Sequence, residues 1–180
     1  MADLLPAPLE GSTGPAASGG GVTAKPAIHH VAFACRDADA THHFYSDLLG
    51  LRLVHTEATP FDKGWFRHLF YDCGDGSAIA FFDLHGVGEP TPLRTAISTD
   101  LDLPAWVNHL ALRVDAVSKA EILGRLEAAG VAPEIEIDHG WCLSTYLTDP
   151  NGILVELCLD QPGLPDEPDE AERLRHIVPG

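Results

Sequence analysis

The sequence has few positive charges. It contains 11 Lys and Arg residues against 27 Asp and Glu residues, and its formal net charge is -16 at pH 7. A protein with this charge repels the phosphate backbone of nucleic acids and anionic membrane surfaces. The composition therefore argues against a nucleic acid or a membrane as partner.

Long apolar runs are also missing. No stretch approaches the roughly 20 consecutive apolar residues that a membrane-spanning helix needs. The first five residues include an Asp and no Lys or Arg, unlike the positively charged start of a secretory signal peptide. We therefore expect the protein in the cytoplasm.

Cysteine is scarce and scattered. The four residues are Cys35, Cys73, Cys142 and Cys158, and no two of them form a Cys-x-x-Cys pair. Most fall in apolar runs that look like strands, which favours buried free thiols in a reducing compartment over disulfides or a thiolate zinc site.

Both ends of the chain have little to bury. Residues 1–26 are mostly Ala, Gly, Pro, Ser and Thr, which predicts a disordered leader. Residues 161–180 form an acidic tail with three Pro residues near its start. This tail is either solvated or forms a short helix at 170–176.

Between these ends the chain repeats one pattern. Each half opens with a strand that contains a His, continues with a helical stretch that ends at Gly50 or Gly130, and then adds three strands. We therefore predict an α+β fold of two βαβββ modules, residues 27–85 and 105–160, joined by a connection at 86–104. The strands expected after the helices are 52–57, 66–72 and 77–84 in the first module and 134–137, 143–148 and 153–159 in the second.

The last two strands of the second module form a predicted hairpin. The residues 149–152 read Asp-Pro-Asn-Gly, which favours a tight turn. Beyond the turn, strand alternation puts Glu156 on one face with Leu154 and Cys158. An ionised carboxylate among apolar residues needs a cation, an Arg or open water, because burying it unpaired costs several kcal/mol, on the order of the known penalties for buried ions.

Two His residues occupy matching positions of the repeat. His30 shares a strand face with Ala32, and His109 shares one with Ala111, so small neighbours leave space over each sheet. If the modules pair about a pseudo-twofold axis, His30, His109 and Glu156 converge. Two imidazoles and one carboxylate are the ligand set of non-haem Fe(II) oxygenases, and less specifically of Mn(II), Ni(II) or Zn(II) sites.

The matching position to Glu156 in the first module is Ala80, four residues after Gly76. A fourth protein ligand is therefore missing from its expected place. A three-ligand site leaves coordination positions for a substrate that chelates through two oxygens. Each His alone is more often a satisfied structural residue, and the repeated context is what favours a metal site.

These motifs resemble the vicinal oxygen chelate superfamily over roughly residues 27–160. The residues that carry the resemblance are Ile-His-His-Val at 28–31, Asn-His-Leu-Ala-Leu at 108–112, and Asp-Pro-Asn-Gly-x-x-x-Glu at 149–156. The superfamily includes glyoxalase I, fosfomycin-resistance transferases, methylmalonyl-CoA epimerase, bleomycin-binding proteins and type I extradiol dioxygenases. Glyoxalase-like and epimerase-like sites usually carry four ligands, and bleomycin-binding proteins carry none, so the resemblance is nearest to the extradiol enzymes.

The extradiol signature places a His and then a Tyr before the turn and the metal Glu. Here these are His139 and Tyr146, with Thr145 standing where the pattern prefers an apolar residue. The resemblance implies that Tyr146 and His139 hydrogen-bond a catechol hydroxyl and the ring-cleavage intermediates. The alternatives are a strand aromatic that packs on the sheet and a surface turn residue.

One residue of the family pattern is absent. Extradiol enzymes of this type carry an acid-base His near the last strand of the first module, and residues 75–82 contain none. His68 and His85 are the two candidates that could replace it in space. Phe82, on the same face as Ala80, would give an aromatic wall suited to a planar apolar substrate.

The resemblance implies a metal-dependent extradiol dioxygenase that binds Fe(II) and cleaves a catechol-like diol with O2. An O2-independent lyase, isomerase or transferase that uses Mn(II), Ni(II) or Zn(II) is the alternative among enzymes. A non-catalytic small-molecule binding protein is the alternative outside them. The expected partner is a small molecule with adjacent oxygens, and the family resemblance adds a homodimer.

Overall fold

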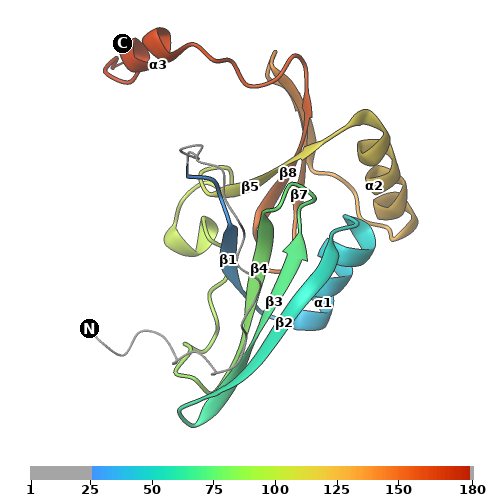
Figure 1. Ribbon diagram of the computed structural model, residues 1–180, viewed down its shortest axis with the longest axis vertical. Helices are drawn as coiled ribbons and strands as arrows, with labels where there is room; N and C mark the ends of the chain where they lie inside the picture. The colour runs from blue at the N-terminus through green and yellow to red at the C-terminus, as the bar shows by residue number, and fades with distance from the viewer. Residues whose placement is uncertain (1–25, 179–180) are drawn as a thin grey trace, which may run out of the picture.

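The structure, a computed structural model, describes residues 26–178. Two four-stranded sheets have the strand orders β1-β4-β3-β2 and β5-β8-β7-β6 (Figure 1). In each sheet the first and last strands of the module pair in parallel and the other pairs are antiparallel. The predicted α+β fold of two βαβββ modules is therefore confirmed. The leader expected at 1–26 lies outside the described residues, apart from Pro26.

The elements follow the repeat. The first module contains β1 (His30–Cys35), α1 (Ala38–His42), the helical segment η1 (His43–Leu48), β2 (Arg52–Phe61), β3 (Gly64–Asp72) and β4 (Ala78–His85). A short turn of helix, η2 (Thr99–Leu101), lies in the connection. The second module contains β5 (His109–Val114), α2 (Ala116–Ala128), β6 (Ile135–Asp138), β7 (Cys142–Thr148) and β8 (Leu154–Asp160), and α3 (Pro168–Leu174) follows it.

The helix that follows the first strand begins in the same way in both modules. Asp37 and Asp115 directly follow the first strand of their module, and each accepts a hydrogen bond from a backbone amide three residues later. A carboxylate at this position satisfies an amide that has no partner inside the helix. At the other end, Gly50 and Gly130 have φ values of 82° and 72°. These left-handed residues were expected from the sequence, and they return the chain to the sheet.

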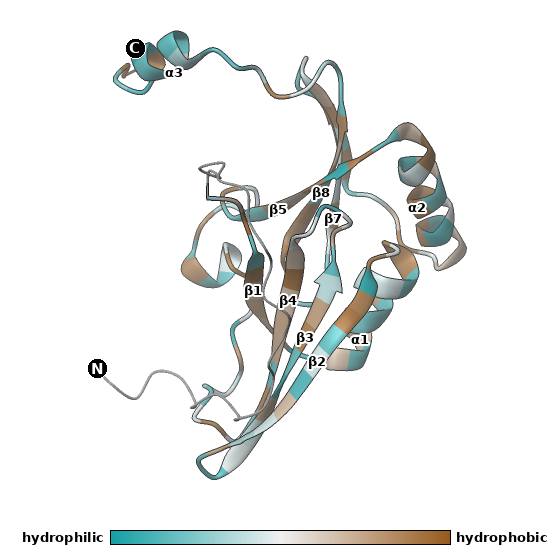
Figure 2. Cartoon of the chain, in the orientation of Figure 1, coloured by the Kyte–Doolittle hydropathy of each residue, from teal (hydrophilic) through white to brown (hydrophobic). Residues whose placement is uncertain are grey.

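The core lies between the sheets and the helices and includes side chains from both modules. Figure 2 shows hydrophobic segments along β1, β4 and β8, in the centre of the molecule. α1 and α2 lie side by side (Figure 1), and Arg125 Nε of α2 donates to the Leu48 carbonyl at 2.8 Å. The two modules therefore pack against each other within one chain.

The turn between β7 and β8 also joins the modules. Asn151 Oδ1 accepts a hydrogen bond of 2.9 Å from the Arg36 backbone amide, and Asp149 Oδ2 accepts one of 3.0 Å from Tyr45 OH. Thr95 Oγ1 of the connection donates to the Asn151 carbonyl at 2.7 Å. In this turn, predicted only as a hairpin turn, Asp149 and Asn151 are buried and fix β8 relative to the first module.

The hairpin β2-β3 is longer than predicted. The expected strand ended at residue 57, whereas β2 continues to Phe61 and turns at Asp62, which has a φ of 50°. Pro60 lies inside this strand, and it is tolerated because β2 is at the edge of its sheet and needs no donor on its outer side.

The acidic tail forms the short helix α3, and none of its residues is buried. In Figure 1 this helix lies away from the two sheets. All four cysteines are free thiols, and three of them are buried, as expected. No helix among residues 26–178 is long and apolar enough to cross a membrane.

Candidate metal centre

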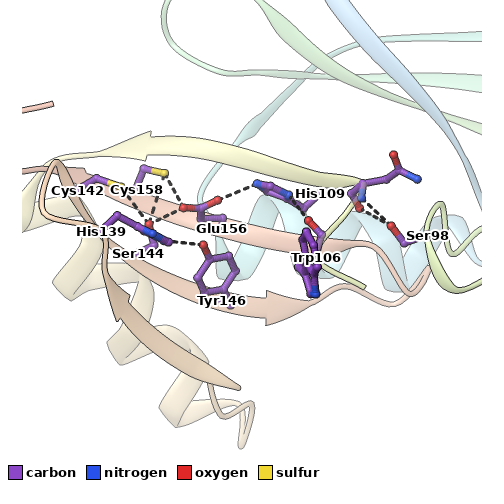
Figure 3. A network of polar contacts seen from close by, with 10 residues as sticks. Ser98, Trp106, His109, His139, Cys142, Ser144, Tyr146, Glu156 and Cys158 are labelled. Atoms are coloured by element: carbon purple, nitrogen blue, oxygen red, sulfur yellow. Dashed lines mark hydrogen bonds and ion pairs between the residues drawn. The ribbon is translucent and has the colours of Figure 1, made fainter. Parts of the chain in front are cut away.

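His109 is the first residue of β5 and is held from the preceding segment. The backbone amide of Asn108 donates to Ser98 Oγ at 2.7 Å, which fixes the entry to the strand. His109 Nδ1 lies 2.9 Å from the Trp106 carbonyl, and a carbonyl can only accept, so Nδ1 carries the proton. The other ring nitrogen, Nε2, points at Glu156 (Figure 3).

Glu156 lies in the middle of β8 and is 4% exposed. Its Oε2 is 2.9 Å from His109 Nε2, so the structure brings together two of the three expected ligands. On the other side of the carboxylate, Oε1 accepts hydrogen bonds from Ser144 Oγ and from Cys158 Sγ, the latter at 3.1 Å. The two carboxylate oxygens therefore face two different sets of groups.

The charge of Glu156 is stabilised from several sides. Burial acts to raise the pKa of this carboxyl, but hydrogen bonds from Ser144 and Cys158 and the nearby Tyr146 and His109 outweigh it, and the pKa is lowered. The carboxylate is therefore ionised at neutral pH. An ionised, buried carboxylate facing an imidazole nitrogen requires either a proton on that nitrogen or a cation between the two groups.

Three further side chains that contact this carboxylate or each other were not identified from the sequence as site residues. Cys142 Sγ lies 3.2 Å from Ser144 Oγ, which in turn lies 3.8 Å from Cys158 Sγ. Burial and the hydrogen bond to Glu156 raise the pKa of the Cys158 thiol to about 12. Strand alternation puts Cys142, Ser144 and Tyr146 on one face of β7, and the register with β8 sets Tyr146 opposite Glu156 and Ser144 opposite Cys158.

The two residues of the extradiol signature meet at the side of the site. His139, in the turn before β7, places its Nε2 3.0 Å from Tyr146 OH (Figure 3). Tyr146 lies directly opposite Glu156 in the β7-β8 register. Burial and the charge of Glu156 raise the pKa of this phenol to about 12, so Tyr146 keeps its proton at neutral pH.

His30 lies on the equivalent strand of the first module but is exposed. Its Nδ1 is 2.8 Å from Nδ1 of His29, and its ring contacts Phe70 and His68 with centroid distances of 5.5 and 6.1 Å. Among residues 26–178, His30, His109 and Glu156 do not form a group whose donor atoms all lie within 4.8 Å of one another. The third ligand therefore stays a prediction.

The register confirms that Ala80 occupies the place of Glu156. Ala80 pairs with Ala32 on β1, just as Glu156 pairs with Ala111 on β5. The first module thus offers no carboxylate at this position, and its face is apolar and aromatic instead.

The two histidines that could replace the missing acid-base residue lie on opposite faces of the first sheet. His68 stacks on Phe82 at a centroid distance of 3.8 Å, on the face that also carries His30. His85 stacks on Trp65 and lies 2.9 Å from Asp83 Oδ2, on the other face. The structure therefore favours His68 over His85.

The surroundings of His109 and Glu156 fit a divalent cation. A His whose second nitrogen is held by a backbone carbonyl, and a carboxylate that carries further hydrogen bonds, have the surroundings that metal ligands typically have. His109 and Glu156 could therefore hold a metal together, with Fe(II), Mn(II), Ni(II) or Zn(II) compatible with nitrogen and oxygen donors.

Comparison with known proteins places this geometry in a family. The model of the Glyoxalase/Bleomycin resistance protein/Dioxygenase superfamily matches residues 27–157. The chain is 33% identical over 108 residues to biphenyl-2,3-diol 1,2-dioxygenase 2 of Rhodococcus globerulus, a match that covers 56% of this chain and 53% of that protein. The chain thus spans about half the length of this curated relative.

Two solved structures share the fold. A glyoxylase/bleomycin resistance protein/dioxygenase domain from Frankia sp. EAN1pec aligns with a TM-score of 0.56 and 20% identity, covering 79% of this chain and 96% of that one. TnmS3, an antibiotic binding protein from Streptomyces sp. CB03234, aligns with a TM-score of 0.53 and 21% identity, covering 78% of this chain and 100% of that one. At these identities the alignments establish the fold alone.

Proposed function

Because this chain belongs to the Glyoxalase/Bleomycin resistance protein/Dioxygenase superfamily, we propose that it is a metal-dependent dioxygenase of the extradiol type. Its substrate is a catechol-like aromatic diol, which it cleaves with O2 in the cytoplasm. The match to a biphenyl-2,3-diol dioxygenase supports this choice within the family. The sequence-based set of His30, His109 and Glu156 supplies the ligands for Fe(II).

The observation that carries the proposal is the pair of His109 and Glu156. Nδ1 of His109 is occupied by the Trp106 carbonyl, so Nε2 is the atom available to a metal, and it lies 2.9 Å from Glu156 Oε2. A bound Fe(II) supplies Lewis acidity toward the adjacent oxygens of a diol and electrons for the activation of O2. With Ala80 in place of a fourth ligand, positions remain open for both oxygens of the diol.

Tyr146, together with His139, provides a hydrogen bond to the substrate. The raised pKa of Tyr146 keeps its phenol as a hydrogen-bond donor toward a diol oxygen. His139 Nε2, at 3.0 Å from that phenol, orients it. Tyr146 can therefore donate a hydrogen bond to a diol oxygen while it keeps its own proton.

His68 serves as the acid-base residue of the first module. Burial lowers the pKa of His68, so its imidazole is neutral at neutral pH and is able to accept a proton. Its Nε2 is buried and has no hydrogen-bond partner among the described residues. The stacked rings of His68 and Phe82 also form a flat wall against which an aromatic diol can lie.

The test is anaerobic reconstitution with Fe(II), followed by 2,3-dihydroxybiphenyl or catechol and then O2. We expect a yellow ring-fission product from the wild-type protein and none from Glu156→Gln. As a matched control, His43→Ala removes an exposed His that contacts Asp47 and should leave product formation unchanged. Failure to form product with any diol would reject the proposal.

A non-catalytic binding protein is the second candidate, because His30 is exposed and contacts His29 rather than Glu156. TnmS3, which shares the fold, is described as an antibiotic binding protein. Metal analysis separates the candidates. A purified protein without stoichiometric metal, whose stability and metal content do not change in His109→Ala, favours binding. Activity with Mn(II), Ni(II) or Zn(II) and no need for O2 favours a lyase, isomerase or transferase.

A further inference from the structure

Glu156 has a second set of neighbours that the proposed dioxygenase site does not use. Cys142, Glu156 and Cys158 each place a donor atom within 4.8 Å of the others. We propose that these three residues form a separate cation site that binds thiophilic divalent cations, of which Zn(II) and Cd(II) are the representatives. This proposal does not rest on the dioxygenase function, because the two thiols take no part in that reaction and the Glu156 oxygen near Cys158, Oε1, is not the one that faces His109.

The two thiols are brought together by strand register. Ser144 lies opposite Cys158 in the antiparallel β7-β8 pair, and Cys142 is two residues before Ser144 on the same face. Cys142 and Cys158 are therefore diagonal neighbours. The scattered positions of the cysteines in the sequence favoured free thiols over a thiolate site, whereas the hairpin brings this pair close together.

Each member of the group is buried. The exposed fractions are 0% for Cys142, 9% for Cys158 and 4% for Glu156. Sγ of Cys158 lies 3.1 Å from Oε1 of Glu156, and the hydroxyl of Ser144 lies between the two sulfurs. The carboxylate oxygen involved is Oε1, whereas the oxygen that faces His109 is Oε2. The two sides of Glu156 therefore serve two sites (Figure 3).

The donor types select the cation. Zinc binds thiolates at about 2.3 Å and carboxylates at about 2.0 to 2.2 Å in a tetrahedron, which places neighbouring donors roughly 3.5 to 4 Å apart. The three donor atoms already lie within 4.8 Å of one another, close to that spacing. Soft thiolates prefer Zn(II) or Cd(II) to Mn(II) or Mg(II). Three protein donors leave a fourth position for water or for Ser144 Oγ.

Cadmium binding to the full-length, reduced and metal-free protein tests the site. On titration with Cd(II) we expect an ultraviolet thiolate-to-cadmium charge-transfer band that saturates at one equivalent per chain. The double variant Cys142→Ala/Cys158→Ala should lose the band, and its affinity for Cd(II) should fall by at least about 100-fold. Cys73 is a half-buried cysteine of the first module, and the matched control Cys73→Ala should keep the band. A band of equal size in the double variant, or no band in the wild type, overturns the proposal.

A measurement on the wild type avoids any doubt about the folding of the double variant. In cadmium-113 NMR, two sulfur ligands shift the resonance far downfield of a site made of oxygen and nitrogen. A downfield signal that is displaced by Zn(II) and unaffected by excess Mg(II) supports the site. A signal only in the oxygen and nitrogen range contradicts it. Neither result depends on ring cleavage, so failure of the dioxygenase assay and failure of this site are distinguishable.

Discussion

Nε2 of His109 lies 2.9 Å from Oε2 of Glu156, although the two residues come from strands at opposite ends of the second module's sequence. The parallel pairing of β5 and β8 produces this contact, because it sets Ala111 opposite Glu156 and His109 two residues away on the same face. The contact is thus a direct consequence of the βαβββ topology.

Removing either member of this pair should weaken divalent metal binding. For His109→Ala and Glu156→Gln we expect the affinity for Mn(II) or anaerobic Fe(II) to fall by about 100-fold or more, since one of few ligands is lost. Equilibrium dialysis measures it, with His43→Ala as the matched control on an exposed His. Unchanged affinity in both variants would show that the metal is bound elsewhere.

Tyr146→Phe should reduce turnover more than substrate affinity. Positioned proton donors contribute roughly 100-fold or more to rate, so we expect kcat of diol cleavage to fall by about 100-fold with a small change in KM. Because Tyr146 and His139 are in contact, the effect of adding His139→Gln should be less than additive. Thr145 lies on the same strand but on its opposite face, so Thr145→Val serves as the control. Additive losses would contradict a shared role.

Asp149→Ala should destabilise the protein strongly. The buried Asp149 carboxylate accepts hydrogen bonds from the amides of Asn151 and Ile153 and from Tyr45 OH. Its removal leaves these donors unpaired, and we expect the free energy of unfolding in urea to fall by about 3 kcal/mol. Asp138→Ala removes the exposed equivalent, which accepts from one amide, and should cost about 1 kcal/mol or less. Similar costs would mean that burial of the turn is unimportant.

His68 should make stability depend on pH. Burial lowers its pKa below the ordinary value of 6.5, so the unfolded chain takes up the proton first as the pH falls. The stabilising contribution is complete above 6.5 and is lost as the pH falls from there toward the folded-state pKa. Urea unfolding of the wild type and of His68→Phe should therefore show the variant gaining relative stability below pH 6.5. A constant difference across this range would argue against a buried neutral imidazole.

The fold could be predicted because its signals are local. Strand alternation, the glycines after each helix and the Asp-Pro-Asn-Gly turn each determine the conformation of a few residues, and the repeat confirms them against one another. The extension of β2 past Pro60 was missed because tolerance of a proline depends on the strand's position at a sheet edge, which the sequence does not state.

The site was predicted only in part, because some of its contacts depend on strand register and on module packing. Strand parity and the repeat predicted that His109 and Glu156 would meet. The family signature singled out His139 and Tyr146, but their contact with each other was not predicted. Cys142 and Ser144 were overlooked because their relation to Glu156 depends on the register of β7 against β8. The position of His30 depends on how the two modules pack, which no short-range pattern determines.

The central claim is that one divalent cation is held by His30, His109 and Glu156. A crystal structure of the protein loaded with Mn(II), an oxygen-stable substitute for Fe(II) that avoids thiols, tests it by anomalous diffraction. Our account predicts one strong anomalous peak bonded to Nε2 of His109 and Oε2 of Glu156, with a ring nitrogen of His30 as the third protein ligand. A well-ordered site with no peak between His109 and Glu156 would contradict it.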